Sequence, residues 1–81
     1  MRLDKYLKVS RIIKRRTVAN EACDAGRVTV NGKVARASYD VKVGDLLTIS
    51  LGQRPITARV TVVTEHALKE DAKTMYEIVE G

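Results

Sequence analysis

The sequence predicts one small α+β domain in which two short packed helices precede a small, mostly antiparallel sheet. Two observations predict this class: apolar residues recur at helical spacing up to Gly26, and β-favouring runs with turn signals follow it. With 81 residues, the chain has room for one modest core and none for a second. We therefore expect a single compact unit.

Residues 2–11 predict a short amphipathic helix. Leu3, Tyr6, Leu7 and Ser10 fall on one face of it, and Asp4 lies near its start, where the helix dipole favours an acid. At this spacing, we expect Tyr6 to pack in the core rather than to stack on a nucleotide base.

A second helix is predicted to begin at Thr17, a residue type that commonly caps helix N-termini. Gly26 is predicted to end it. Small side chains suit close packing against the first helix, and the predicted buried stripe consists of Val18, Ala19, Ala22 and Cys23.

The sheet is predicted from residue 27 onward. Asn31-Gly32 between two β-favouring runs is a strong hairpin signal, and we interpret it as a turn requirement rather than a ligand contact. Further strands are predicted over 46–51 and 56–62, after a turn at Gly44-Asp45.

The secondary structure of residues 64–81 is predicted less clearly by the sequence pattern. Residues 65–74 are polar and turn-like, and residues 74–80 suit either a final strand or a short helix. We expect a domain over 1–63 and an extension over 64–81 that belongs to the same compact unit.

Charge is distributed unevenly along the chain. The formal net charge is +5, yet ten of the fifteen Lys and Arg residues and only three of the ten acids lie within residues 1–36. Such a concentration suits a polyanion, since phosphate neutralisation releases counterions. A solvated face that maintains solubility is the alternative interpretation of the charge alone.

Several classes of function find no support in the sequence. Cys23 is the one cysteine, so no internal disulfide forms, and we expect it to be buried and unreactive, while His66 is expected to be exposed. We find no metal-ligand spacing, no nucleophile paired with a base and no apolar run long enough for a membrane span or a secretory signal. We expect a cytoplasmic, non-enzymatic protein without cofactor or metal.

Basic residues gather where a helix is predicted to begin. A helix N-terminus offers free backbone N–H groups to phosphate, and Lys14, Arg15 and Arg16 stand beside it. Arginine adds bidentate phosphate contacts. If the hairpin folds back beside the helices, Arg2, Arg27 and Lys33 extend this basic patch.

Four short motifs occur together in the first two-thirds of the chain. They are Arg2-Leu3-Asp4, Arg16-Thr17-Val18-Ala19, Gly26-Arg27-Val28-Thr29-Val30-Asn31-Gly32-Lys33 and Val41-Lys42-Val43-Gly44-Asp45. In order and spacing they resemble the S-four-type RNA-binding domain, the alpha-L motif first described in a small-subunit ribosomal protein. The resemblance implies structured RNA as the ligand.

Among stand-alone members, the chain is similar to the RqcP family of bacterial ribosome-associated quality control. The related fifteen-kilodalton ribosome-associated heat-shock family usually carries tryptophans in its first helix and a longer basic tail, whereas this chain has Tyr6 and Val9 there and ends in Glu80-Gly81. These departures favour the RqcP family over the heat-shock family.

The resemblance to the RqcP family implies a function and a set of RNA-binding residues. The protein would bind obstructed large ribosomal subunits at rRNA and peptidyl-tRNA and, with the factor RqcH, support addition of C-terminal alanine tails to stalled chains. It is expected to be a monomer when free. By matched position Arg2 and Arg16 are the main rRNA contacts. The supporting RNA-binding residues are Arg11, Lys14, Arg15, Arg27 and Lys33.

The sequence also leaves two other classes of function open. A DNA-binding helix-turn-helix module fits two short helices and a basic turn, although residues 18–25 offer few polar groups to read base edges. A protein-interaction module whose basic patch meets an acidic partner is the other.

Overall fold

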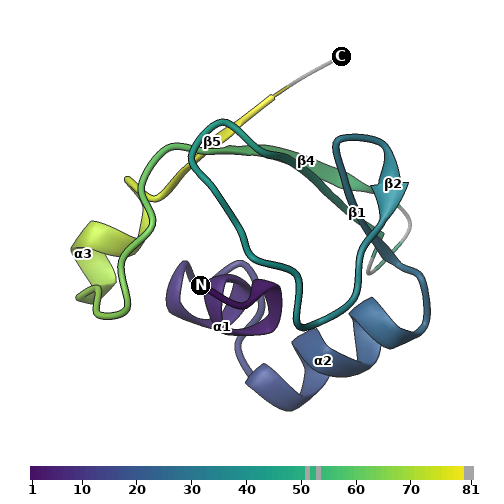
Figure 1. Cartoon of the computed structure of the whole chain (residues 1–81). Coiled ribbons are helices and arrows are strands. Elements are labelled where there is room, and N and C mark those ends of the chain that lie inside the picture. Colours follow the sequence, from purple (N-terminus) through teal and green to yellow (C-terminus); the bar gives the residue numbers. More distant parts are fainter. Residues whose placement is uncertain (51, 53, 80–81) are drawn as a thin grey trace.

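The computed structural model describes residues 1–50, 52 and 54–79. Within them the element order is α1 (Leu3–Val9), α2 (Arg16–Asp24), β1 (Val28–Val30), β2 (Lys33–Val34), β3 (Leu46–Ile49), β4 (Ile56–Val60), α3 (Lys69–Ala72) and β5 (Tyr76–Ile78). The strands form one sheet in the order β2-β1-β3-β4-β5, and every neighbouring pair is antiparallel (Figure 1). The predicted fold class is confirmed.

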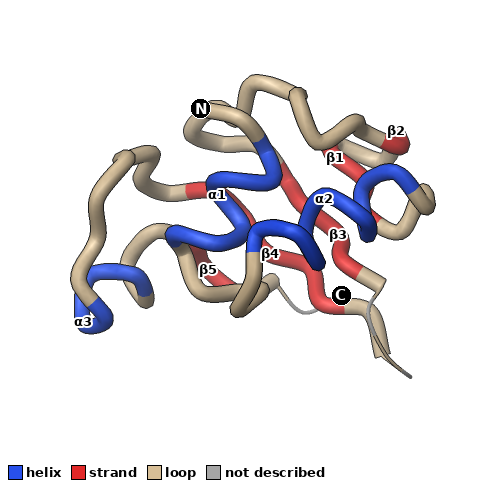
Figure 2. Tube along the Cα trace, turned by 90° about the horizontal axis from the view of Figure 1, so that it is seen from below, coloured by secondary structure: helices blue, strands red, loops and turns tan. Residues whose placement is uncertain are grey.

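Helices α1 and α2 cover one face of the sheet (Figure 2). Alternating residues of the strands point toward them, and Val28, Leu47 and Ile49 are almost completely buried there. From α1, Leu3 and Leu7 fill the same space with no exposed area. Burial of such side chains, each stabilising by about 1.5–3 kcal/mol, produces the core between the two layers.

Tyr6 lies wholly inside the core, as its helical spacing predicts. Its hydroxyl donates a hydrogen bond of 2.6 Å to the backbone carbonyl of Met75, and burial, followed by the nearby Tyr76, raises the pKa of the phenol. The side chain is therefore a structural link, and it has no face on which a base could stack.

Helix α2 differs from the prediction at its start. It begins at Arg16, with Arg15 in extended conformation as the N-cap residue and no side-chain cap, so the prediction of Thr17 as N-cap is wrong. The start is held from outside the helix, because Arg16 and Asn20 both donate to Asp4 of α1.

The stripe that α2 buries is narrower than predicted. Ala19, Ala22 and Cys23 are buried, but Val18 is 40% exposed and the prediction for it is wrong. At 100° per residue, Val18 lies at the edge of the stripe.

Gly26 ends α2 as predicted. It adopts φ +75°, and its N–H donates to Cys23 while the N–H of Arg27 donates to Ala22. These two bonds satisfy carbonyls that the helix end leaves free, in the Schellman arrangement.

The later strands are shorter than predicted. β3 ends at Ile49, and Leu51 lies outside the described residues; β4 ends at Val60, because the N–H groups of Thr61 and Val62 both turn to the carbonyl of Met75. The predicted turn-like segment 65–74 contains the single helical turn α3, so that prediction is wrong there, and the C-terminal alternative is resolved as strand β5.

The segment after β4 packs onto the rest of the molecule. β5 pairs with β4, and Ala72 and Met75 are each only 1% exposed. In the part of the chain that the structure describes, no helix has the length and apolar character that a membrane span requires.

Candidate nucleic-acid interface

An acid lies between basic residues of the two helices. Asp4, in the first turn of α1, is only 3% exposed. Its carboxylate accepts hydrogen bonds from Arg2, Arg16 and Asn20 and from the backbone N–H of Lys5 at 2.8 Å. We call Arg2, Asp4, Arg16 and Asn20 the Asp4 cluster.

Both arginines of the Asp4 cluster approach the carboxylate in the same way. Arg2 donates from Nε to Oδ1 at 3.2 Å and from Nη2 to Oδ2 at 3.4 Å. Arg16 donates from Nη2 to Oδ1 at 3.4 Å, and its Nε lies 3.4 Å from Oδ2. Each guanidinium thus uses its Nε–Nη2 side for Asp4, and the side formed by its two terminal nitrogens remains for another acceptor.

The two guanidinium groups stay accessible although they are paired. The side chain of Arg2 is 51% exposed and that of Arg16 is 47% exposed, whereas that of Asp4 is 4% exposed. Two positive charges share one negative charge, so the Asp4 cluster is net positive. This geometry holds two half-exposed arginine side chains on one carboxylate, and guanidinium groups of this kind bind phosphate well.

Asp4 remains ionised in this setting. Burial alone raises the pKa of a carboxyl, but hydrogen bonds from Arg2, Asn20, Arg16 and the Lys5 N–H outweigh it and hold the pKa of Asp4 below its ordinary value of 3.8. The negative charge that orients the arginines is present throughout the neutral range.

The loop after the hairpin holds the start of α1. The N–H groups of Leu3 and Asp4, which the helix itself leaves unpaired, donate to the carbonyls of Tyr39 and Ala37 at 2.8 and 3.2 Å. Arg2 forms a β-bridge with Asp40. Residues 37–40 therefore determine where Arg2 stands.

A second carboxylate ties the hairpin to the Gly44-Asp45 turn. Asp45 accepts from the hydroxyl of Tyr39 at 2.9 Å, from the side chain of Asn31 at 3.2 Å and from the N–H of Lys42 at 3.0 Å. Burial would raise the pKa of Asp45, but these three bonds lower it overall. The side-chain amide oxygen Oδ1 of Asn31 accepts in addition from the N–H of Leu46 at 3.0 Å.

Asn31 consequently has two roles. Its φ of +52° and that of Gly32, +84°, match the turn that the sequence predicts. Its side chain also links β1 to the beginning of β3, a contact within the protein that the sequence does not predict.

The other predicted RNA-binding residues lie outside the Asp4 cluster. Lys14 and Arg15 are exposed in the connection before α2, next to Arg16. Arg27 follows the end of α2 and lines a cavity with Val18 and Glu21. Lys33 is on β2, at the far end of the domain from α3 (Figure 1).

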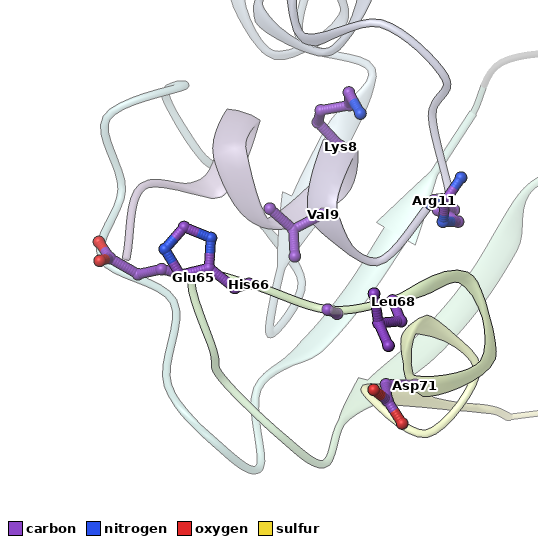
Figure 3. Close-up of a pocket in the computed structure, with 8 residues that line it drawn as sticks. Lys8, Val9, Arg11, Glu65, His66, Leu68 and Asp71 are labelled. Atoms are coloured by element: carbon purple, nitrogen blue, oxygen red, sulfur yellow. The ribbon is translucent and has the colours of Figure 1, made fainter.

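Arg11 points to a different part of the molecule. It has φ +63° in the turn after α1 and lines a cavity of about 370 Å³ with Lys8, Glu65, His66 and Asp71 (Figure 3). Two of these neighbours are acids, so the surroundings of Arg11 suit a polyanion less than those of Arg16. His66 is exposed here, as expected.

Cys23 is 2% exposed, and burial, followed by the charges of Asp4 and Asp24, raises the pKa of its thiol to about 11. The thiol is therefore protonated at neutral pH, and the prediction that Cys23 is buried is confirmed.

Sequence reasoning missed the role of Asp4 as acceptor and the part played by Asn20. The signal for Asn20 was available, because Arg16 and Asn20 are four residues apart and share a helix face. For Asp4, the sequence indicated a helix-dipole role, and the pairing with Arg16 across twelve residues depends on the packing of α1 against α2.

Comparison with known proteins agrees with this arrangement. The S4 domain family model matches residues 1–47, which include Arg2, Asp4, Arg16, Asn20 and the hairpin. The chain is 58% identical over 78 residues to a protein of Halalkalibacterium halodurans named RQC P-site tRNA stabilizing factor, covering 96% of this chain and 89% of that protein. The chain belongs to the S4 domain family and, within it, to the family of the RQC P-site tRNA stabilizing factors.

Two further matches place this S4 domain protein among its relatives. The protein of the same name from Bacillus subtilis is 53% identical over 79 residues, which cover 98% of this chain and 92% of that protein. The structure of heat shock protein 15 from Vibrio cholerae, described as trimeric, superimposes with a TM-score of 0.91 at 28% identity and covers 98% of this chain and 81% of that one. The predicted relation to both groups is confirmed, and identity is about twice as high with the quality-control factors.

Proposed function

We propose that this protein is a non-catalytic RNA-binding factor of bacterial ribosome-associated quality control that works in the cytoplasm. It binds obstructed large ribosomal subunits at rRNA and peptidyl-tRNA. The names of its relatives support the tRNA and the P site as its place of action.

The single observation that carries this proposal is the pair of half-exposed arginines in the Asp4 cluster. Arg2 and Arg16 each give one side of the guanidinium to Asp4 and keep the other for a phosphate. Lys14 and Arg15 stand next to Arg16, at the N-terminus of α2, where backbone N–H groups also favour an anion. The mode of binding is recognition of RNA shape and backbone.

In this role the protein bridges two RNAs. It would hold the peptidyl-tRNA against the rRNA while RqcH delivers alanyl-tRNA, so that alanine tails grow on the stalled chain. It contributes contacts and no chemical step. We propose that it reaches the ribosome as a monomer, which sedimentation of the free protein tests.

The decisive variant is Arg16→Ala. We expect it to abolish co-sedimentation with large subunits while the circular dichroism spectrum stays that of the parent. Arg59→Ala is the matched control, because Arg59 is an exposed arginine on β4, outside the helices. If Arg16→Ala co-sediments as Arg59→Ala does, the assignment of Arg16 is wrong.

A heat-shock-protein-like role in rescuing blocked large subunits is the second candidate, favoured by the superposition on heat shock protein 15. Affinity purification of the tagged protein separates the two. Recovery of large subunits with tRNA and RqcH supports the quality-control role. Large subunits recovered without RqcH support the rescue role, and preference for duplex DNA in competition contradicts both.

A further inference from the structure

The cavity beside the β-hairpin differs from the other described cavities in charge. It lies between the hairpin and the loop over 35–39 and has a volume of about 700 Å³. Lys33 and Arg36 line it, and none of its lining residues is an acid. The three other described cavities each include at least one carboxylate, from Asp4, Glu21, Glu65 or Asp71.

The walls of this hairpin cavity are fixed by hydrogen bonds. The N–H of Ala35 donates to Val28, and the N–H of Tyr39 donates to Arg36 at 3.0 Å, which closes a turn. The hydroxyl of Tyr39 is held by Asp45 at 2.9 Å. The backbone on this side of the cavity and the ring of Tyr39 are therefore held in place without a ligand.

Its chemistry has an apolar part and a cationic part. Val34, 66% exposed, and the half-buried ring of Tyr39 offer apolar area, and Ser38 adds a hydroxyl group. Asn31 is already engaged with Asp45 and Leu46, so it contributes shape rather than free donors. An occupant should therefore be flat and apolar at one end and anionic at the other.

We propose that the hairpin cavity binds one unpaired nucleotide of RNA, with the base against Val34 and Tyr39 and the phosphate on Lys33 and Arg36. Single-stranded nucleotides are commonly held in this way, by a base on an apolar or aromatic surface and a phosphate on cations. The identification of the nucleotide as part of an RNA rests on the proposed function. The site is distinct from the Asp4 cluster, and it explains why the basic half of the chain extends to Arg36.

The test uses the full chain and a probe of defined chemistry. Backbone amide shifts are followed by nuclear magnetic resonance while adenosine 5′-monophosphate is added, with inorganic phosphate and adenosine in parallel titrations. We expect the nucleotide to shift amides over residues 33–39, with affinity at least about fivefold above either fragment alone, since base and phosphate contacts combine.

Two pairs of variants distinguish binding in the cavity from an effect of the protein's net charge on nucleotide affinity. Val34→Asp and Val43→Asp each add one acid at an equally exposed valine, 66% and 65%, and only Val34 lines the cavity. Arg36→Gln and Arg59→Gln likewise each remove one exposed arginine. We expect Val34→Asp and Arg36→Gln to weaken nucleotide binding at least about fivefold and the two controls to stay within about twofold.

Three results would overturn the proposal: shifts that map to residues 14–16 instead, equal loss in Val34→Asp and Val43→Asp, or inorganic phosphate binding as tightly as the nucleotide. Tighter binding of a tetraglutamate peptide at the same residues would assign the cavity to an acidic protein and also contradict it. Arg16→Ala should leave the nucleotide shifts unchanged. Failure at the cavity is therefore distinguishable from failure of the proposed function, which ribosome co-sedimentation measures.

Discussion

At the scale of single residues, Asp4 is an acid inside a surface that is proposed to bind RNA. A simple charge count treats it as unfavourable, since it repels phosphate. The structure gives it another effect, because it holds Arg2 and Arg16 side by side with one side of each guanidinium free. Donors placed in advance lose less conformational entropy on binding.

Net charge and the placement of the two arginines predict opposite changes in RNA affinity for Asp4→Asn. Removing the negative charge should tighten RNA binding if net charge decides and weaken it if placement decides. We expect about tenfold weaker binding to large-subunit rRNA, since binding must then order two freed arginine side chains at about 0.5–1.5 kcal/mol each, and 1.4 kcal/mol is a factor of ten. The control is Glu21→Gln, because Glu21 is an exposed acid on α2. Equal RNA affinity of the two variants would contradict the claim that Asp4 acts by placing the two arginines.

The ionisation of Asp4 also gives a pH dependence of stability. Because its folded-state pKa is below 3.8, the carboxylate stabilises the fold above that pH, and this contribution is lost as pH falls through the folded-state pKa. We expect the difference in free energy of unfolding between the parent and Asp4→Asn to be constant from about pH 8 to about pH 5 and to shrink toward about pH 3. Urea unfolding followed by circular dichroism measures it, and a difference that persists at acid pH would show that charge is not its source.

At the scale of elements, the hairpin is positioned by more than its turn. Asn31 supplies the positive φ that the turn demands, and its side chain binds Asp45 and the N–H of Leu46. The motifs around Asn31-Gly32 and Gly44-Asp45 therefore contact each other in the folded protein, through the bonds of Asn31 to Asp45 and Leu46. They position β2, and with it Lys33.

Asn31→Gly separates these two roles. Glycine adopts positive φ freely, so the variant is neutral if the turn alone matters. We expect instead a loss of about 1–2 kcal/mol in the free energy of unfolding, because two side-chain hydrogen bonds disappear and buried acceptor capacity of Asp45 is left unused. Thermal unfolding measures it, and a stability equal to the parent's would show that the side-chain bonds contribute nothing.

At the scale of the whole molecule, the first helix is tied to the last strand region. The hydroxyl of Tyr6 donates to Met75, 69 residues away, inside the core. With the pairing of β4 and β5, this contact makes residues 64–79 part of the surroundings of α1. We propose on this ground that the extension and the domain over 1–63 unfold together.

Tyr6→Phe tests this tie. The carbonyl of Met75 keeps the N–H groups of Thr61 and Val62 as donors. We therefore expect a loss of about 0.5–1.5 kcal/mol in the free energy of unfolding, the net contribution of one hydrogen bond, with no change in RNA affinity, because Tyr6 has no exposed surface. Tyr76→Phe is the control, since within the described residues the Tyr76 hydroxyl makes no hydrogen bond. Separate unfolding of residues 64–79 in the parent, seen by hydrogen exchange, would contradict a single unit.

The sequence by itself determined the local structure of this protein. Apolar spacing predicted both helices, Gly26 predicted the end of the second helix, and Asn31-Gly32 predicted the hairpin, because each depends on the conformational preference of a few neighbouring residues. It also located the basic residues and, through four spaced motifs, the family. Thr17, Val18 and segment 65–74 were wrongly predicted because contacts from other elements decided the start of α2, its buried face and the formation of α3.

Only the tertiary structure decided which basic residues act together. It placed Arg2 and Arg16 on one buried carboxylate, put Arg11 in the lining of a cavity that Glu65 and Asp71 also line, and put Lys33 and Arg36 around a cavity without acids. The physical reason is that the effect of a charge depends on its distance to other charges and on its exposure to water, and the packing of distant segments sets both.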